Sequence, residues 1–110
     1  MAMAMSLLNC AEQCESVLRS HSMSPEVQSN VEWKRKLILA IAAMQVAATS
    51  RIVEGEAQRD ALQLVIRASR DASEALDKQG LDRELRLCAT CCERAASICA
   101  AALATADGTA

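Results

Sequence analysis

Six cysteines carry the most distinctive chemistry in this sequence, and they gather near its two ends. Cys10 and Cys14 form a CxxxC pair, and the stretch LDRELRLCATCCERAASICAAAL (81–103) adds Cys88, Cys91, Cys92 and Cys99. Residues four apart lie on one face of an α-helix, so each CxxxC pair presents two thiols in one direction. Thiolates are soft ligands that favour Cu(I), with Zn(II) as the second choice. The spacing therefore predicts a thiolate metal site.

The stretch 81–103 has the pattern of an amphipathic helix with its thiols on the buried side. Steps of four and three residues along it define a seam, a line of positions that keeps one helix face turned toward a partner for about three heptads. The seam positions are Leu81, Leu85, Cys88, Cys92, Ala95, Cys99 and Ala102. Cys91 lies one step round from this line, and charged residues occupy the opposite face. We expect the seam to be buried.

A simpler explanation is that the thiols only fill space. Free cysteine is among the most buried residue types and packs like a small hydrophobic residue, and this seam also contains alanine. Two functions therefore stay open: a metal-binding bundle, or a structural or partner-binding helical module. A redox role would need an accessible thiol with a lowered pKa, and Cys91, which lies off the seam, is the candidate for it.

Four helices are expected to position these residues, at about 3–20, 25–54, 57–78 and 82–104. The first has its own seam at Met3, Leu7, Cys10, Cys14 and Val17, and the third at Ala61, Val65, Ala68, Ala72 and Ala75. The second helix begins near 25, where Ser24 caps and Pro25 follows, or near 30, where Ser29-x-x-Glu32 has capping-box form. Gly55 and Gly80 are expected to end helices. Short connections favour antiparallel neighbours, so we predict an all-α, antiparallel up-down-up-down four-helix bundle in a single domain, residues 1–110.

The relative height of the thiols depends on how the first and last helices are aligned. If these helices are neighbours with flush ends, facing positions have numbers that sum to about 109. Cys10 then faces Cys99, Cys14 faces Ala95 and His21 faces Cys88. This register predicts two thiol clusters, one toward each end, with His21 as a further candidate ligand. Disulfides within one helix are disfavoured, because Cβ atoms four residues apart are about 5–6 Å from each other, and a disulfide needs about 3.8 Å. A cross-helix disulfide stays open.

Composition argues against several classes of protein. The net charge of −2, the pI near 5.4 and the single aromatic residue, Trp33, argue against nucleic-acid binding. No uninterrupted apolar run has the length of a membrane span, and the N-terminus does not have the form of a signal peptide. We therefore expect a cytoplasmic protein with reduced thiols and no membrane partner. The sequence contains no P-loop, nucleophile elbow or HExxH motif, so we do not expect an enzyme.

The middle of the second predicted helix, LILAIAAMQVAA (37–48), is apolar almost all the way round. A bundle helix needs an apolar stripe only about 100° wide. The excess fits a central helix between two neighbours, or a homo-oligomer interface, because apolar patches of this size usually have a partner.

Two stretches, CAEQCESVL (10–18) and LCATCCERAASICA (87–100), resemble the small cysteine-rich four-helix-bundle proteins that include the bacterial copper-storage (Csp) proteins. The second stretch is similar to the last helix of that family, with some cysteines replaced by alanine. LILAIAAMQVAATSRIVEG (37–55) is similar to its second helix without the cysteines. The resemblance implies Cu(I) bound by thiolates inside the bundle, with Cys10, Cys14, Cys88, Cys91, Cys92 and Cys99 as ligands. Because the two middle helices lack cysteine, it implies a lower capacity than a core filled with copper.

Overall fold

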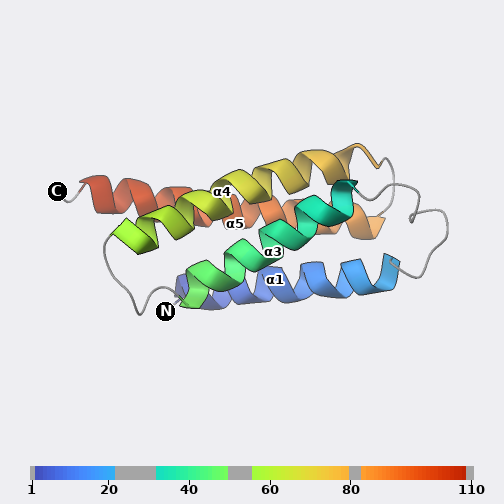
Figure 1. Ribbon diagram of the computed structural model, residues 1–110, viewed down its shortest axis with the longest axis horizontal. Coiled ribbons are helices and arrows are strands. Elements are labelled where there is room, and N and C mark those ends of the chain that lie inside the picture. Colours follow the sequence, from blue (N-terminus) through green and yellow to red (C-terminus); the bar gives the residue numbers. More distant parts are fainter. Residues whose placement is uncertain (1, 22–31, 50–55, 80–82, 109–110) are drawn as a thin grey trace.

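The computed structural model of the chain describes residues 2–21, 32–49, 56–79 and 83–108, and almost all of these residues are helical. The four helices are α1 (Ala2–His21), α3 (Glu32–Thr49), α4 (Glu56–Asp77) and α5 (Arg83–Gly108). They lie along one long axis, and each runs opposite to the helix before it (Figure 1). The prediction of an all-α four-helix bundle is confirmed.

Helix α5 extends further than predicted. We expected its helical structure to stop near Ala104, but it continues to Gly108. The segment after Leu103 is rich in alanine, the strongest helix former, and contains no proline. The predicted start signals of the second helix, at Ser24–Pro25 and Ser29, lie outside the described residues. The predicted helix ends at Gly55 and Gly80 also lie outside the described residues.

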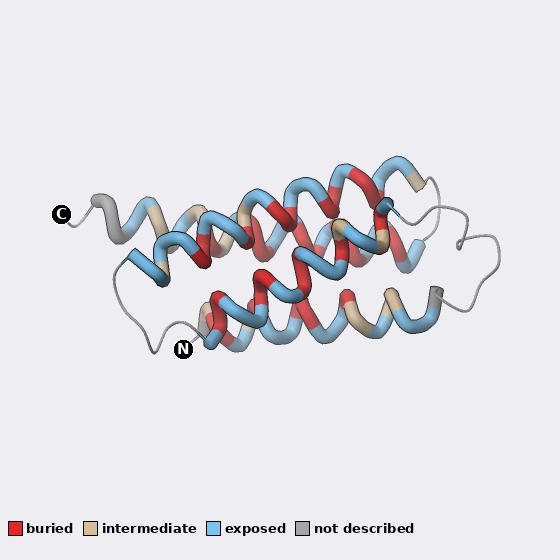
Figure 2. Tube along the Cα trace, in the orientation of Figure 1, coloured by how far each residue is buried: buried red, intermediate tan, exposed pale blue. Residues whose placement is uncertain are grey.

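The helices form a ring in chain order. Helix α1 packs against α3 and α5, and α4 packs against the same two helices. Figure 2 shows the buried residues repeating along the inner sides of the helices. The core consists mostly of alanine, leucine and cysteine, and its largest fully buried side chain is Trp33. Most of the predicted seam residues are buried: Leu7, Cys10, Cys14, Ala61, Val65, Ala68, Ala72, Ala75, Leu85, Cys88, Cys92, Ala95 and Cys99. Met3, Val17 and Ala102 are only half-buried, and Leu81 lies outside the described residues.

Side-chain hydrogen bonds between described residues also connect neighbouring helices. Gln45 of α3 donates through Nε2 to Glu15 Oε1 of α1 at 2.6 Å. Ser73 of α4 donates through Oγ to Glu93 Oε1 of α5 at 3.1 Å. Both bonds join helices that are adjacent in the ring, so they support the same set of neighbours as the apolar core.

Helix α5 also has the length and composition of a membrane span over Arg83–Thr105, where the mean hydropathy of its most apolar window is 1.4. The sequence prediction considered only uninterrupted apolar runs and did not anticipate this. Of that window, 39% is buried inside the bundle, and the buried part includes the alanines and cysteines of the seam. Length and composition alone are weak evidence for a membrane span, because core helices of soluble proteins can share them.

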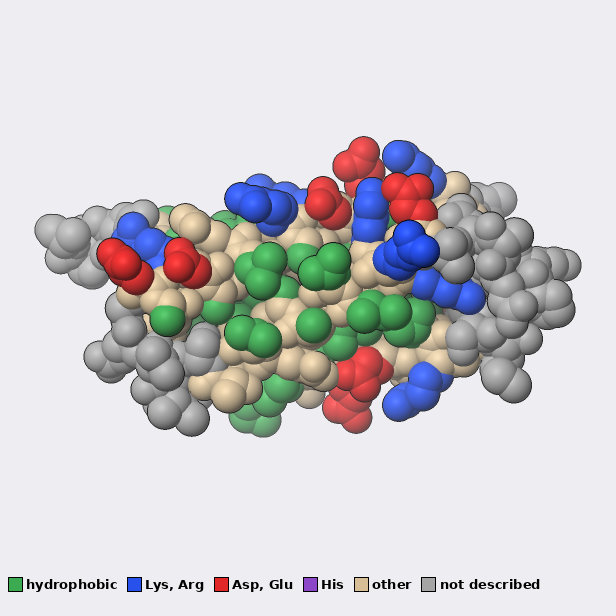
Figure 3. All heavy atoms as spheres, in the orientation of Figure 1, with side chains coloured by type: hydrophobic (Ala, Val, Ile, Leu, Met, Phe, Trp, Pro, Cys, Tyr) green, Lys and Arg blue, Asp and Glu red, His purple; other side chains and the backbone are tan. Residues whose placement is uncertain are grey.

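Helix α3 is apolar on its outer side as well as its inner side. Ile38, Leu39 and Val46 are 53%, 57% and 54% exposed, and the small Ala42 between them is also exposed. Figure 3 shows hydrophobic side chains gathered across the middle of the molecular face that α3 and α4 form. We call Ile38, Leu39, Ala42 and Val46 the apolar face of α3. The position of α3 between two neighbours therefore accounts for only part of its apolar surface.

Candidate metal centre

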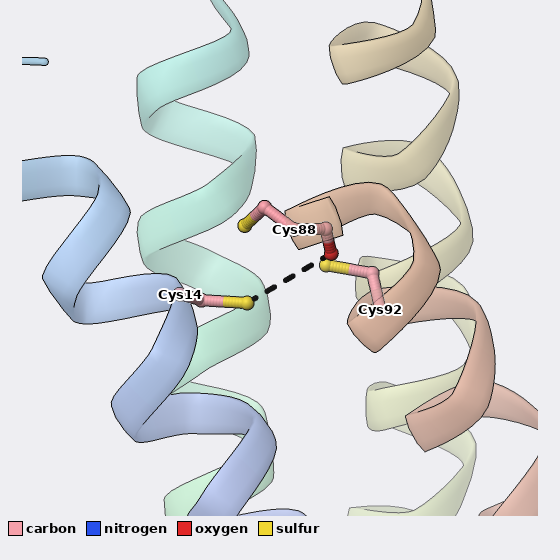
Figure 4. Close-up of side chains that lie close together, drawn as sticks. All are labelled: Cys14, Cys88 and Cys92. Carbon is pink, nitrogen blue, oxygen red and sulfur yellow. Dashed lines mark hydrogen bonds between the residues drawn. The ribbon is translucent and has the colours of Figure 1, made fainter. Parts of the chain in front are cut away.

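Three cysteines from two helices converge in the interior of the bundle. Cys14 comes from α1, and Cys88 and Cys92 come from successive turns of α5. Their sulfur atoms all lie within 4.8 Å of one another, in a group that could hold a metal ion. Figure 4 shows the three side chains directed into the space between the two helices. We call these three residues the inner cluster.

The inner cluster is fully enclosed. Cys14 and Cys92 are 0% exposed and Cys88 is 1% exposed. The i,i+4 spacing of Cys88 and Cys92 places both thiols on the side of α5 that faces α1. Small residues around them, such as Ala11 and Ala95, are also buried. They allow the two helices to approach closely, so thiols on opposite helices can meet.

The separation of the sulfur atoms fits a small, soft ion. A metal–sulfur bond is about 2.3 Å long, so three thiolates around one ion lie about 4.0 Å apart. The inner cluster needs to contract by less than about 1 Å to reach that arrangement. Rotation about the side-chain bonds of cysteine can supply this movement without a change in the backbone. The donor set therefore fits a thiophilic metal ion.

The three thiols differ in their tendency to ionise. Hydrogen bonds from the Cys14 and Cys92 thiols lower the pKa of Cys88 to about 5. The bond that Cys14 donates to Cys88, together with burial, raises the pKa of Cys14 to about 12. Hydrogen bonding of the Cys92 thiol with Cys14 and Cys88, together with burial, raises the pKa of Cys92 as well. The Cys14 thiol also lies 4.0 Å from the Cys88 carbonyl oxygen (Figure 4), a long contact even for sulfur. We therefore expect Cys88 to give up its proton more readily than Cys14 and Cys92.

A second pair of thiols lies next to the inner cluster. The Cys91 thiol is within hydrogen-bonding reach of Cys10 across the α1–α5 contact, and it also donates to Gln13 Oε1 at 2.9 Å. We call Cys10 and Cys91 the outer pair. Burial raises the pKa of both, that of Cys91 to about 11. Cys91 is thus a buried thiol with a raised pKa, and the idea of an accessible, activated Cys91 was wrong.

The predicted register was wrong by about one to two helical turns. Cys14 faces Cys88 and Cys92 rather than Ala95, and Cys10 meets Cys91 rather than Cys99. The described part of the chain therefore brings five thiols into one group instead of two clusters at opposite ends. Flush helix ends were an assumption, and the side-chain pattern alone does not set the axial offset between two helices.

Cys99 and His21 stand apart from this group. Cys99 is fully buried, and burial alone raises its pKa to about 11, without a contribution from another thiol. His21 is the last residue of α1, and its side chain lies outside the described residues. Cys88, its predicted neighbour, faces Cys14 instead, about 10 Å along the helix axis from His21. All six cysteines are free thiols.

Comparisons of the chain with protein-family models, curated protein sequences and solved structures found no match. The case for a function rests on the geometry of the thiols.

Two residues beside the thiols were not singled out from the sequence. Gln13 accepts the hydrogen bond of Cys91, and the positive charge of Arg94 acts on both Cys10 and Cys91. Both follow from helical spacing once a thiol is known to matter, because Gln13 is three residues after Cys10 and Arg94 is three residues after Cys91. Their partners across the helices depend on the register and could not be read from spacing.

Proposed function

We propose that this protein binds and buffers Cu(I) through the thiolates of its inner cluster. The observation that carries the proposal is the convergence of Cys14, Cys88 and Cys92 within 4.8 Å in the interior. Three sulfur donors select a soft ion, and hydrogen bonding links the three thiols to one another. The same residues carry the resemblance to the copper-storage proteins.

Cu(I) is preferred over Zn(II) because of the number of ligands. Structural zinc sites are closed by four ligands in a tetrahedron, whereas the inner cluster supplies three. Two or three thiolates are enough to complete the coordination of Cu(I). Zinc remains the second candidate ion, with a thiol of the outer pair as its fourth ligand.

Storage or buffering suits this site better than catalysis. The inner cluster is at most 1% exposed, so no surface is left on which a substrate could sit beside the ion. Because thiols must stay reduced to bind, we place the protein in a reducing compartment, the cytoplasm. Helices α3 and α4 contain no cysteine, so the capacity is a few ions per chain.

Titration with Cu(I) tests the proposal. Reduced protein, handled without oxygen, is expected to take at least one Cu(I) per chain from a competing chelator. The Cys88→Ala/Cys92→Ala variant is expected to lose the ion of the inner cluster, and Cys99→Ala, which removes a buried thiol outside the group, is expected to keep it. If the unmodified chain cannot compete with a weak Cu(I) chelator, the proposal is wrong.

The second candidate is a homo-oligomeric helical module in which the cysteines only pack. The apolar face of α3 favours it, because its large side chains lie on either side of Ala42. Two copies of α3 crossing in antiparallel fashion at Ala42 would place Leu39 of each copy against Val46 of the other, a self-complementary contact about a twofold axis. Replacing all six cysteines by alanine or serine would then leave the oligomeric state in solution largely unchanged.

A further inference from the structure

The inner cluster brings thiols of two different helices close enough to react with one another. Cys14 belongs to α1, and its sulfur lies within 4.8 Å of the sulfur atoms of Cys88 and Cys92 on α5. Rotation about the side-chain bonds of cysteine can shorten such a distance without a change in the backbone. A bond between Cys88 and Cys92 is disfavoured, because their Cβ atoms are about 5–6 Å apart and a disulfide needs about 3.8 Å. The geometry therefore favours a disulfide that joins α1 to α5.

The contact between α1 and α5 is the one at which the bundle can open most easily. Among the described residues, it is the smallest of the contacts between neighbouring helices of the ring. The other neighbouring pairs are consecutive helices, each joined by a connecting segment, whereas α1 and α5 are not consecutive. Proteins open locally where few contacts hold an element in place. Separation of α1 from α5 would give a small reagent access to the buried thiols of the inner cluster.

We propose that the inner cluster is a redox switch. In the metal-free protein, a peroxide joins Cys14 to one of the two inner cysteines of α5, and the disulfide abolishes metal binding until a dithiol reduces it. The disulfide uses two of the three sulfur donors. The one thiol that remains is fewer than the two thiolates that Cu(I) needs. The loss of metal binding rests on the proposed function, whereas the disulfide follows from the geometry of the cluster alone.

The oxidation moves two electrons from two sulfur atoms to one peroxide. A thiolate of the inner cluster attacks hydrogen peroxide, so that a sulfur–oxygen bond forms, the oxygen–oxygen bond breaks, and the hydroxide that leaves takes up a proton. The thiol of the other helix then attacks this sulfur, forms the disulfide and releases the oxygen as water. Two thiols and one hydrogen peroxide thus give one disulfide and two water molecules. A dithiol reverses the switch by thiol–disulfide exchange and becomes a disulfide itself.

Treatment of the reduced, metal-free protein with hydrogen peroxide tests the switch. Two of the six free cysteines are expected to become unreactive toward an alkylating reagent, and the intact mass is expected to fall by two hydrogen atoms. Fragmentation of the linked peptides is expected to place the bond between Cys14 and Cys88 or Cys92. A bond between Cys10 and Cys91, oxidation to sulfinic acid without a crosslink, or no reaction at all overturns the proposal.

Two variants separate the inner cluster from the cysteines beside it. Cys10→Ser/Cys91→Ser leaves Cys14 as the cysteine of α1, and it is expected to form the crosslink at about the rate of the unmodified chain. Cys14→Ser leaves Cys10 on α1 and is expected to form no crosslink to α5. Equal crosslinking in both variants overturns the proposal. Circular dichroism checks that the variants fold, and peptide fragmentation of the unmodified chain decides the outcome if one of them does not.

The effect on metal binding is measured with the Cys10→Ser/Cys91→Ser variant, which lacks the outer pair. Its oxidised form is expected to take up no Cu(I) from a chelator that gives one ion to the reduced form, and a dithiol is expected to restore the uptake. Equal uptake by both forms overturns the switch. If the crosslink forms but the reduced, unmodified chain binds no Cu(I), the proposed function fails and the disulfide does not.

Discussion

At the scale of single residues, Cys88 differs from its two partners in charge. We expect Cys88 to carry the negative charge at neutral pH, because hydrogen bonds from Cys14 and Cys92 lower its pKa, whereas Cys14 and Cys92, whose pKa values are raised, keep their protons. An ion that binds all three sulfurs must therefore displace two protons near pH 7. The empty site is thus partly prepared for a cation before the cation arrives.

The difference in pKa between Cys88 and its two partners predicts how the affinity of the inner cluster for Cu(I) depends on pH. Protons compete with the ion for Cys14 and Cys92, so affinity falls as pH falls, by about 100-fold per pH unit between roughly pH 6 and 8. The measurement is a competition titration at several pH values with a chelator of known pH dependence, on the Cys10→Ala/Cys91→Ala variant to isolate the inner cluster. A slope of 1000-fold per unit would mean that Cys88 is protonated in the empty site, contrary to its environment here.

Ser69 on α4 is a second residue whose surroundings predict a measurable effect, in this case on the stability of the fold. It is 0% exposed, and its Oγ has no hydrogen-bond partner among the described residues. An unsatisfied buried hydroxyl costs about 1–3 kcal/mol. We therefore expect Ser69→Ala to raise the free energy of unfolding by about 1 kcal/mol, measured by urea denaturation.

Ser73 is the matched control for that substitution. It lies one turn further along α4 and is 3% exposed, but its hydroxyl donates to Glu93. Ser73→Ala gains the same helix propensity and loses a hydrogen bond, so its effect is expected to be near zero or destabilising. Equal stabilisation by both substitutions would show that helix propensity, and not the unsatisfied hydroxyl, is responsible.

At the scale of helices, the sequence allowed the elements to be predicted but not their axial offset. The burial of Leu85, Cys88 and Cys92 follows from the period of the seam, because that period is set by helix geometry. The partner of Cys14 follows from how far α5 slides along α1. Small residues such as Ala11 and Ala95 pack acceptably in several registers, so their pattern carries little information about the offset.

The inner cluster joins α1 to α5, which predicts an effect of Cu(I) on stability. Cys14 and Cys88 are 74 residues apart in the chain, and only the folded bundle brings them together. Free ion at 100 times its dissociation constant should stabilise the fold by about 2.7 kcal/mol, which is a rise in Tm of roughly 10 °C for a chain of this size.

Thermal unfolding monitored by circular dichroism, with and without Cu(I), checks this effect. Cys14→Ser is the informative variant, because it leaves both thiols of α5 in place but removes the one that α1 contributes. Its Tm should change much less on addition of Cu(I) than that of the unmodified chain. An equal rise in both proteins would mean that Cys14 is not needed to hold the ion.

At the scale of the whole molecule, the apolar face of α3 is the feature that the bundle itself does not explain. We expect it to bury itself against a second copy of the chain, so that Leu39→Glu/Val46→Glu lowers the mass in solution to that of one chain. Leu87→Glu on α5 is the control, because Leu87 is 59% exposed but lies outside this face. Light scattering gives the molecular mass in solution of the unmodified chain and of the two variants. A single-chain mass for the unmodified protein would rule out self-association.

The thiols that would hold copper come from the first and last helices of the chain, while the two middle helices contribute none. A bound ion would thus fasten α1 to α5, and a protease would separate these two helices more easily in the empty protein. We expect the lifetime of the protein in the cell to follow the copper supply: degraded within a short time when copper is scarce, and retained when it is plentiful. Pulse-chase labelling in copper-starved and copper-fed cells would reveal such self-adjusting abundance, which requires no regulation of the gene.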